Sequence, residues 1–311
     1  MNQYFDNSAR RLFRAYRNGS IRMGHSFIRL LLEPLLHKRQ EIQLRSGLKL
    51  EIDLSKGNQN AIFWNDGDVD IHLYWAIREL VPLGGLFIDC GANFGLMGLL
   101  ARQYRLANVI FIEPHPRLAK SIMVNIRLNG FAQSCELIEA AASDIGGDVS
   151  FFEDPLHDGS HSLHQDWGEG LMALGKVRCV TLREIIDTKG IRKINFLKID
   201  TEGNDYNVLK GMGNYLDPHF TDIVYLEMSS NRRAIYDLMD SKGYIGFAYQ
   251  TGSRRGISQA QHLYEAGGQP CFFVPLTKPA NTNGDVLWCD QDSFTASFLN
   301  RLHSSTAKSH S

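Results

Sequence analysis

Short apolar runs alternate with amphipathic stretches through the middle of the chain. Five runs predict buried strands, at residues 86–90, 109–113, 135–141, 194–200 and 222–228. Helical periodicity follows three of them, at residues 94–104, 116–128 and 204–210. Thr181 and Glu184 form a capping box ahead of another short helix. This alternation is typical of an α/β fold with a mostly parallel sheet.

The two ends of the chain and one internal segment depart from this pattern. Residues 244–249 and 271–275 predict two late strands without a full helix between them, hence a terminal antiparallel hairpin on the parallel sheet. Residues 154–176 fit no regular element, so we expect an insertion loop that acts as a lid. The polar residues 303–311 predict a disordered tail. The expected domains are therefore residues 1–45, residues 46–280 with that insertion loop, and residues 281–311 with a C-terminal helix and the tail.

Residues 1–45 form the one strongly basic region, with nine Lys and Arg residues against three acids. Apolar residues between 27 and 36 predict a helical, amphipathic extension. A basic amphipathic helix lies on an anionic membrane surface or on a partner in some proteins, and packs on the protein's own core in others. The sequence leaves both interpretations open.

Composition narrows the class of protein. With 311 residues, 43% hydrophobic and 22% charged, the chain has the apolar content of a folded globular protein. The net charge of −1 gives no global attraction to nucleic acid. Five cysteines without CxxC spacing indicate a reducing compartment. We expect a cytoplasmic protein, since no apolar run reaches the ~18 residues of a membrane span and no signal peptide is evident. Nothing in the sequence indicates an oligomeric state.

The strongest chemical signal is the segment Phe87–Gly95 (FIDCGANFG), a strand that enters a small-residue turn. Neither a Walker loop nor GxGxxG fits, which weakens an ATP or NAD assignment. Asp89 at the strand end repels a diphosphate but suits a ligand with an ammonium and a sulfonium, and S-adenosylmethionine has both. Glu113 ends the next strand 24 positions later, where an acid can bind both ribose hydroxyls. Taken singly, each acid is also explained as a solvated strand end.

A third strand, in Phe196–Gly203 (FLKIDTEG), again ends in acids. The segments DCGANFG and LKIDTEGNDYNVLKG resemble the two signatures of the FkbM-type methyltransferases, D-x-GAN-x-G and KIDVEG followed by an acid and LKG. Thr201 stands in place of the usual Val and Asn204 in place of the usual Ala. The resemblance covers roughly residues 60 to 250 and implies a Rossmann-like class I methyltransferase fold.

The resemblance also implies transfer of a methyl group from S-adenosylmethionine to an oxygen, often on a sugar or a sugar-derived natural product. The residues that it implies for cofactor binding are Asp89, Gly91, Ala92, Asn93, Gly95 and Glu113. It further implies that Lys198, Asp200 and Glu202 face the acceptor or support it.

A sugar hydroxyl is a very weak acid, so a base or a metal ion must help to remove its proton. Asp200, Glu202 and Glu227 are candidates to act directly or to hold Mg²⁺ or Ca²⁺. Glu202 is also explained as an acid favoured at a helix N-terminus. His161 in the insertion loop is a candidate general base. The loop histidines also fit zinc ligation, or a solvated loop with no chemical role.

We therefore expect an S-adenosylmethionine-dependent O-methyltransferase that acts on a small-molecule or glycan acceptor. Two alternatives are a non-catalytic module that binds the cofactor or a partner, and a nucleic-acid methyltransferase. The neutral net charge and the absence of an Asn/Asp-Pro-Pro-Phe/Tyr motif argue against the latter.

Overall fold

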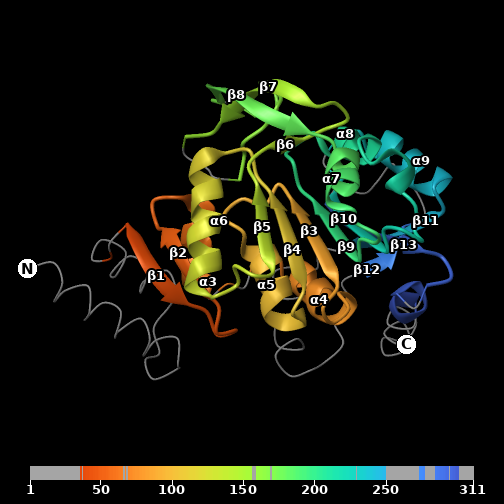
Figure 1. The fold of residues 1–311 in the computed structure, drawn as a ribbon, viewed down its shortest axis with the longest axis horizontal. Coiled ribbons are helices and arrows are strands. Elements are labelled where there is room, and N and C mark those ends of the chain that lie inside the picture. Colours follow the sequence, from red (N-terminus) through yellow and green to blue (C-terminus); the bar gives the residue numbers. More distant parts are fainter. Residues whose placement is uncertain are drawn as a thin grey trace, which may run out of the picture. The chain divides into compact units, whose positions relative to one another are not determined.

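The computed structural model describes most of the chain between residues 36 and 300 (Figure 1). The described residues are 36, 38–65, 67, 69–155, 159–168, 170–228, 230–249, 273–276, 284–293 and 295–300. The chain divides into two compact units, one of residues 1–69 and one of residues 70–311.

In the first unit, an antiparallel hairpin precedes a helix. Strand β1 (Arg39–Gln43) pairs with β2 (Lys49–Asp53), and α3 (Gly57–Asn65) follows. The strand β1 lies inside residues 1–45, so the prediction of a helical extension is wrong for its last part. With Ile42 as its only apolar side chain, this segment shows neither a helical nor a strand period. Residues 1–35, the greater part of the predicted extension, lie outside the described residues.

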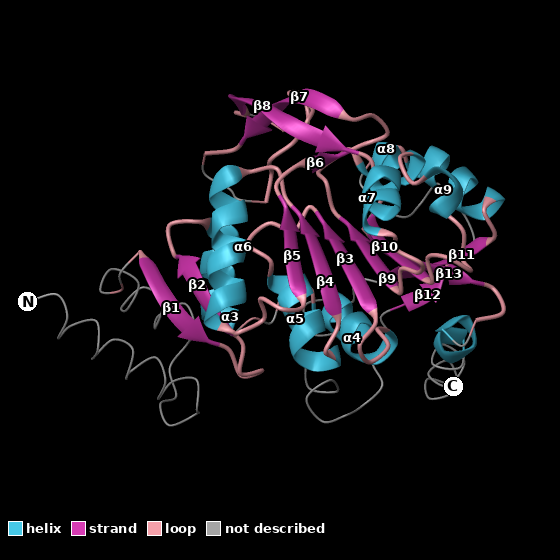
Figure 2. Ribbon diagram, viewed as in Figure 1, coloured by secondary structure: helices cyan, strands magenta, loops and turns pink. Residues whose placement is uncertain are grey.

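An eight-stranded sheet organises the second unit (Figure 2). In spatial order its strands are β12 (Phe273–Pro275), β11 (Tyr244–Tyr249), β13 (Asp285–Asp290), β10 (Ile223–Glu227), β9 (Phe196–Ile199), β3 (Leu86–Cys90), β4 (Asn108–Ile112) and β5 (Cys135–Ile138). The strands from β10 to β5 run parallel, whereas β13 is antiparallel to both neighbours. This arrangement confirms the predicted Rossmann-like class I fold, a mostly parallel sheet with antiparallel strands at one end.

Helices connect the strands of this sheet and cover it. They are α4 (Ile71–Leu80), α5 (Leu96–Arg105), α6 (Pro116–Leu128), α7 (Leu182–Lys189), α8 (Asp205–Lys210) and α9 (Arg232–Ser241), with a 3₁₀ turn at Gly213–Tyr215. Helix α5 packs on β3 and β4, α6 on β5, and α9 on β11. The predicted capping box begins α7: the Thr181 hydroxyl accepts the Glu184 N–H at 3.0 Å, and the Glu184 carboxylate accepts the Thr181 N–H at 2.8 Å.

The core has two layers because strand side chains alternate between the two faces of the sheet. On one face, Ile88 and Cys90 of β3 join a cluster with apolar residues of α7, α8 and α9. On the other face, Phe87, Phe111 and Phe196 are fully buried. The alternation also places Asp89 and Lys198 on this second face, opposite each other on adjacent strands. Two charged groups are thus enclosed in an otherwise apolar layer.

Several elements agree closely with the predicted ranges, but the last strand was missed. Strands β3 and β11 and helix α6 have the predicted bounds. Strand β13 falls in residues 281–311, where we expected only a helix and a tail; residues 295–300 are indeed helical. Its apolar run is only four residues long, too short to distinguish a strand from a helix by periodicity. Because β13 inserts between β10 and β11, the described antiparallel end of the sheet has the three strands β12, β11 and β13, whereas a two-stranded hairpin was predicted.

A smaller sheet follows β5 in the chain and has the order β6-β8-β7 (Figure 2). Its strands are β6 (Ala141–Ala142), β7 (Gly147–Glu153) and β8 (Met172–Val180). The expectation that residues 154–176 lack regular structure is therefore wrong from Met172 onward. Residues 172–176 are all exposed, so they carry no alternation of apolar and polar positions that would reveal a strand.

Two further observations concern cysteines and membrane spans. The four cysteines within the described ranges, at positions 90, 135, 179 and 289, are all free thiols. In the part of the chain that the structure describes, no helix combines the length and the apolar character needed to cross a bilayer.

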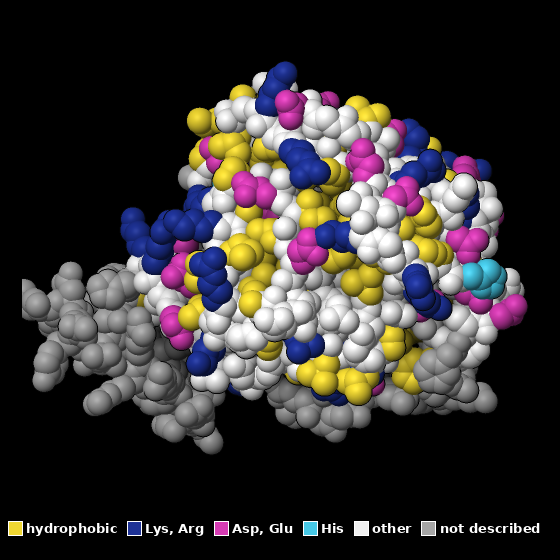
Figure 3. Space-filling model, viewed as in Figure 1, with side chains coloured by type: hydrophobic (Ala, Val, Ile, Leu, Met, Phe, Trp, Pro, Cys, Tyr) yellow, Lys and Arg dark blue, Asp and Glu magenta, His cyan; other side chains and the backbone are white. Residues whose placement is uncertain are grey.

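Acidic and basic side chains are interspersed on the face shown in Figure 3, in keeping with the net charge of −1.

Candidate functional site

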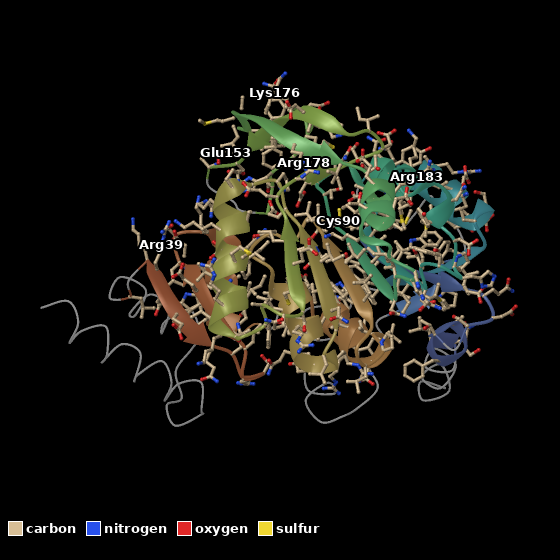
Figure 4. The ribbon with its side chains drawn as sticks, viewed as in Figure 1. Arg39, Cys90, Glu153, Lys176, Arg178 and Arg183 are labelled. Atoms are coloured by element: carbon tan, nitrogen blue, oxygen red, sulfur yellow. The ribbon has the colours of Figure 1, made fainter. Side chains whose placement is uncertain are left out.

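The glycine-rich turn begins after Cys90, the last residue of β3 (Figure 4). Gly91, Asn93 and Gly95 all have left-handed backbone conformations, with φ of 73°, 55° and 91°. A Cβ added to Gly91 would lie 1.8 Å from the backbone oxygen of Asp200, which follows β9. Gly91 is therefore required by the close approach of the backbone at Asp200, directly after the neighbouring strand. Ala92 is buried, and its N–H donates to the Ile112 carbonyl at 3.2 Å.

Asp89 joins β3, which precedes this turn, to α5, which follows it. Its side chain is fully buried, and its Oδ2 accepts the N–H of Gly98 in the first turn of α5 at 2.9 Å. Backbone N–H groups at a helix start have no partner inside the helix, and a carboxylate there also complements the helix dipole. Burial raises the pKa of Asp89, and Lys198 opposes that rise. Asp89 therefore fixes the orientation of α5 relative to β3.

Glu113 holds the same turn from the next strand. Its Oε2 accepts the Asn93 N–H at 2.8 Å, and its Oε1 accepts the His115 N–H at 2.9 Å. Burial raises the pKa of Glu113 to about 7, although these two hydrogen bonds favour the ionised form. Each carboxylate oxygen has a second lone pair, so both oxygens can still accept a hydrogen bond from a hydroxyl group. Glu113, which was predicted to bind the ribose hydroxyls, thus also binds the backbone of the glycine-rich turn.

Lys198 connects the turn to the second signature. Its Nζ donates to the Gly91 carbonyl at 3.0 Å and lies 3.3 Å from both Asp89 Oδ1 and Asp200 Oδ2. Burial alone would lower the pKa of Lys198, but the carboxylates of Asp200 and Asp89 outweigh it and the pKa is raised. The lysine is therefore a buried cation with two anionic partners. Only Asp200 reaches solvent, with 43% of its side chain exposed.

The turn after β9 is strained at the predicted acid. Glu202 has a φ of 50°, an uncommon conformation for a residue with a side chain. Asp205 closes the turn by accepting the Thr201 N–H at 2.9 Å and the Thr201 hydroxyl at 2.8 Å. Burial and the neighbouring Asp200 raise the pKa of Glu202 to about 8. Such strain and such a shift are characteristic of functional positions.

Further acids meet at this edge of the sheet. Glu227 ends β10, and Asp285, which begins the antiparallel β13, is its register partner. Burial and Asp200 raise the pKa of Glu227 to about 7. The predicted residues Asp200, Glu202 and Glu227 are therefore electrostatically coupled, as the carboxyl ends of adjacent parallel strands require.

Residues from α4 join this edge and were missed in the sequence. Asp70, with φ of 48°, precedes α4, and burial raises its pKa. His72 Nε2 lies 2.7 Å from Asp285 Oδ2, and its ring stacks on Tyr249 with centroids 3.8 Å apart. The hydroxyl of Tyr225 also bonds to Asp285. No spacing rule links positions 70–72 to 225–285, so only the fold reveals them.

His161 lies in a different part of the site from the acids of the second signature. Its ring is buried against His115 with centroids 4.5 Å apart, and its Nδ1 accepts the Asp154 N–H at 3.1 Å. His115 caps α6, as its Nδ1 accepts the Arg117 N–H at 3.2 Å, and its Nε2 lies 3.1 Å from Glu153 Oε2. His115 is thus the N-cap residue of α6. His157 lies outside the described residues.

The charged side chains at this edge fit S-adenosylmethionine. The described acids Asp200, Glu202 and Glu227 are anionic or titratable, whereas the one buried lysine already has two carboxylate partners. Such an edge suits a ligand that carries an ammonium and a sulfonium, and it repels a diphosphate. Among the described residues, no three His, Cys, Asp or Glu side chains are arranged to hold a metal ion, so the suggested Mg²⁺ or Ca²⁺ finds no support there.

Several known proteins resemble this chain in sequence or in fold. The sequence is 24% identical to the methyltransferase sdnD of Sordaria araneosa over 194 residues, 53% of this chain and 75% of that protein. It is 29% identical to the hexuronic acid methyltransferase AglP of Haloferax volcanii over 129 residues, 41% of this chain and 50% of that protein. A solved structure of TrmK from M. capricolum with S-adenosylhomocysteine aligns with a TM-score of 0.41 and 9% identity, covering 72% of this chain and 70% of that one.

A family model described as the methyltransferase FkbM domain matches residues 89–245, half of the chain. The match begins at Asp89 and includes both the glycine-rich turn and the acidic turn after β9. These are the two segments that Lys198 joins at the carboxyl edge of the sheet. The chain therefore belongs to the FkbM methyltransferase domain family and is an S-adenosylmethionine-dependent methyltransferase.

Proposed function

We propose that the protein transfers the methyl group of S-adenosylmethionine to a hydroxyl oxygen of a sugar, a glycan or a polyhydroxylated natural product. One observation carries the proposal: at a single sheet edge, the turn bound by Glu113 adjoins a cluster of carboxylates, to which Lys198 joins it. In this cluster Asp200 is partly exposed, and Glu202 and Glu227 have raised pKa values. A relative named as a hexuronic acid methyltransferase supports a sugar-like acceptor.

Glu113 is proposed to accept the ribose hydroxyls, and the backbone from Gly91 to Gly95 to pack against the cofactor. Asp89 would act through the turn, because its carboxylate is buried beneath it. The bound cofactor supplies an activated methyl group, so the first task of the protein is to align the acceptor oxygen with it.

The second task is to accept the hydroxyl proton. We assign it to Asp200 or Glu202, because Asp200 is exposed at the edge and the pKa of Glu202, about 8, lies near neutral pH. His161 is a weaker candidate than it was from sequence, since its Nδ1 already accepts a backbone N–H and its ring is buried. Bound S-adenosylmethionine would supply the methyl group that bonds to the acceptor oxygen, and its sulfur would keep the electron pair of the broken carbon–sulfur bond. The hydroxyl proton passes to the carboxylate.

The test has two stages. Calorimetry with S-adenosylmethionine measures cofactor binding, and incubation with labelled cofactor and a glycan and metabolite extract, followed by mass spectrometry, identifies what gains a methyl group. We expect binding and methylation at oxygen. Binding without any methylated product would favour a non-catalytic module, and methylation of nitrogen or of nucleic acid would refute the O-methyltransferase proposal.

A further inference from the structure

Trp167 is placed at the acidic turn by the insertion loop. It lies between β7 and β8, and its Nε1–H donates to Glu202 Oε2 at 2.8 Å. Tryptophan is a rare choice for an insertion loop of this kind, since its large apolar ring gains little there without a surface to pack on. Here the ring is only partly buried, while the N–H is bonded to a carboxylate.

The ring packs against the backbone of the second signature. A Cβ added to Gly203, whose φ is 96°, would lie 2.4 Å from a carbon of the Trp167 ring. A larger residue at this position would displace the indole. The glycine of this signature therefore provides the surface on which one side of the tryptophan rests.

A second contact anchors the loop to the same turn. The Ser162 hydroxyl donates to the Glu202 carbonyl at 2.7 Å and accepts the His164 N–H at 3.1 Å. The backbone N–H of Trp167 in turn donates to the His164 carbonyl at 3.2 Å. Both the side chain and the backbone of Glu202 are thus held by the loop, and the loop forms a wall beside the carboxylates.

We propose that Trp167 is a specificity-determining and positioning residue: its N–H fixes the Glu202 carboxylate, and its partly exposed ring stacks on a cyclic sugar unit of the acceptor. This inference rests on the proposed function. A pyranose ring presents C–H groups on one face and hydroxyls at its rim. An indole suits the apolar face, and nearby carboxylates suit the hydroxyls. The inferred acceptor is therefore cyclic, and an open-chain polyol would lack the flat face.

The hydrogen bond has a second consequence. Burial raises the pKa of Glu202 most, the neighbouring Asp200, Glu227 and Asp205 raise it further, and the Trp167 indole N–H lowers it. Loss of the N–H should raise the pKa of Glu202 further. A variant that keeps an aromatic ring but lacks the donor should then shift the pH profile of turnover upward and leave the acceptor KM nearly unchanged.

A binding experiment tests the stacking without a known acceptor. The sequence has four tryptophans, and the other three, Trp64, Trp75 and Trp288, are buried. Quenching of fluorescence by iodide should therefore report mainly on Trp167. With the full chain and S-adenosylhomocysteine, we expect methyl glucopyranoside to lower the quenching constant at least twofold and sorbitol at the same concentration to leave it unchanged. Equal protection by both probes, or by neither, would overturn the proposal.

Variants complete the test once an acceptor is known. Trp167→Leu should raise the acceptor KM about tenfold or more, whereas Trp167→Phe should move the rising limb of the pH profile to higher pH. The neighbouring exposed Asp166→Asn is the control and should do neither. Failure of the proposed function can be distinguished from failure of the stacking proposal, because in that case the wild-type protein itself would not bind the cofactor or would not transfer a methyl group. If transfer occurs but both Trp167 variants match the control, the stacking proposal alone is wrong.

Discussion

Replacement of Lys198 by Met should expose how much the buried charge pair stabilises the fold. In the wild-type protein, Asp89 is fully buried and has two polar partners, the Lys198 ammonium and the Gly98 N–H. Met fills a similar volume but leaves the Asp89 carboxylate with the helix N–H alone. Asp200 is half-exposed, so water replaces its lost partner at little cost.

The size of the effect follows from the burial of Asp89. A buried charge left without its partner typically costs about 3–5 kcal/mol. For a domain of this size each kcal/mol lowers Tm by about 2–4 °C, so the expected decrease is about 6–20 °C. The loss should shrink as the pH is lowered, because the raised pKa of Asp89 rises further without Lys198. A carboxyl with a raised folded pKa destabilises the fold above that pKa and ceases to do so once it is protonated.

A double-mutant cycle tests this reasoning. Thermal and urea unfolding at pH 7.5 would be measured for Lys198→Met, Asp89→Asn and the double variant. The double variant removes both charges and leaves no buried ion, so it should be more stable than Lys198→Met alone. If Lys198→Met costs less than about 1 kcal/mol, or if the two single effects simply add, the two residues are not coupled as the structure indicates.

Three further predictions concern the turns and the acids. Gly91→Ala should prevent normal folding, because its Cβ would meet a backbone oxygen at 1.8 Å; Gly130→Ala, at a similar φ of 68° but with open space around it, should cost only about 1–2 kcal/mol in urea unfolding. Glu113→Gln should weaken cofactor binding in calorimetry by about tenfold or more, through loss of a charge-assisted contact. It should also remove the decrease in stability that the raised pKa of Glu113 causes between about pH 4.5 and 7, and an unchanged pH dependence would contradict that pKa. Asp200→Asn should keep cofactor affinity within a few-fold while turnover falls by about 10²–10⁴; full turnover would remove Asp200 from the catalytic assignment.

The parallel part of the sheet was predictable because its strands are buried on both faces. Residues 86–88 and 109–112 form unbroken apolar runs, and an acid, Asp89 or Glu113, follows each run directly near the carboxyl edge. The strand β8 was not predictable, because most of its side chains are exposed and its pairing with β7 is visible only in three dimensions. Periodicity reports burial, and strands without burial leave no such signal.

The candidate site was likewise predictable from the sequence only in part. The roles proposed for Asp89 and Glu113 follow from their places at strand ends, although the structure adds that Glu113 binds the turn itself and that Asp89 binds the start of α5. The contacts of His72 with Asp285 and of Trp167 with Glu202 join residues 213 and 35 positions apart. Neither pair belongs to a short motif, so a single sequence carries no local signal for it.

The position of β13 sets an order on folding during synthesis. Strand β11 pairs with β12 and β13 and with no other described strand, and β13 is the last of the described strands to leave the ribosome. Until then, the apolar edge of β10 has no neighbour, and Tyr244–Tyr249 cannot join the sheet. Unpaired edges of this kind promote aggregation of nascent chains. A stop codon shortly before Asp285 would thus remove an internal strand of the sheet. In the truncated protein, β11 and β12 would have no strand through which to pair with β10.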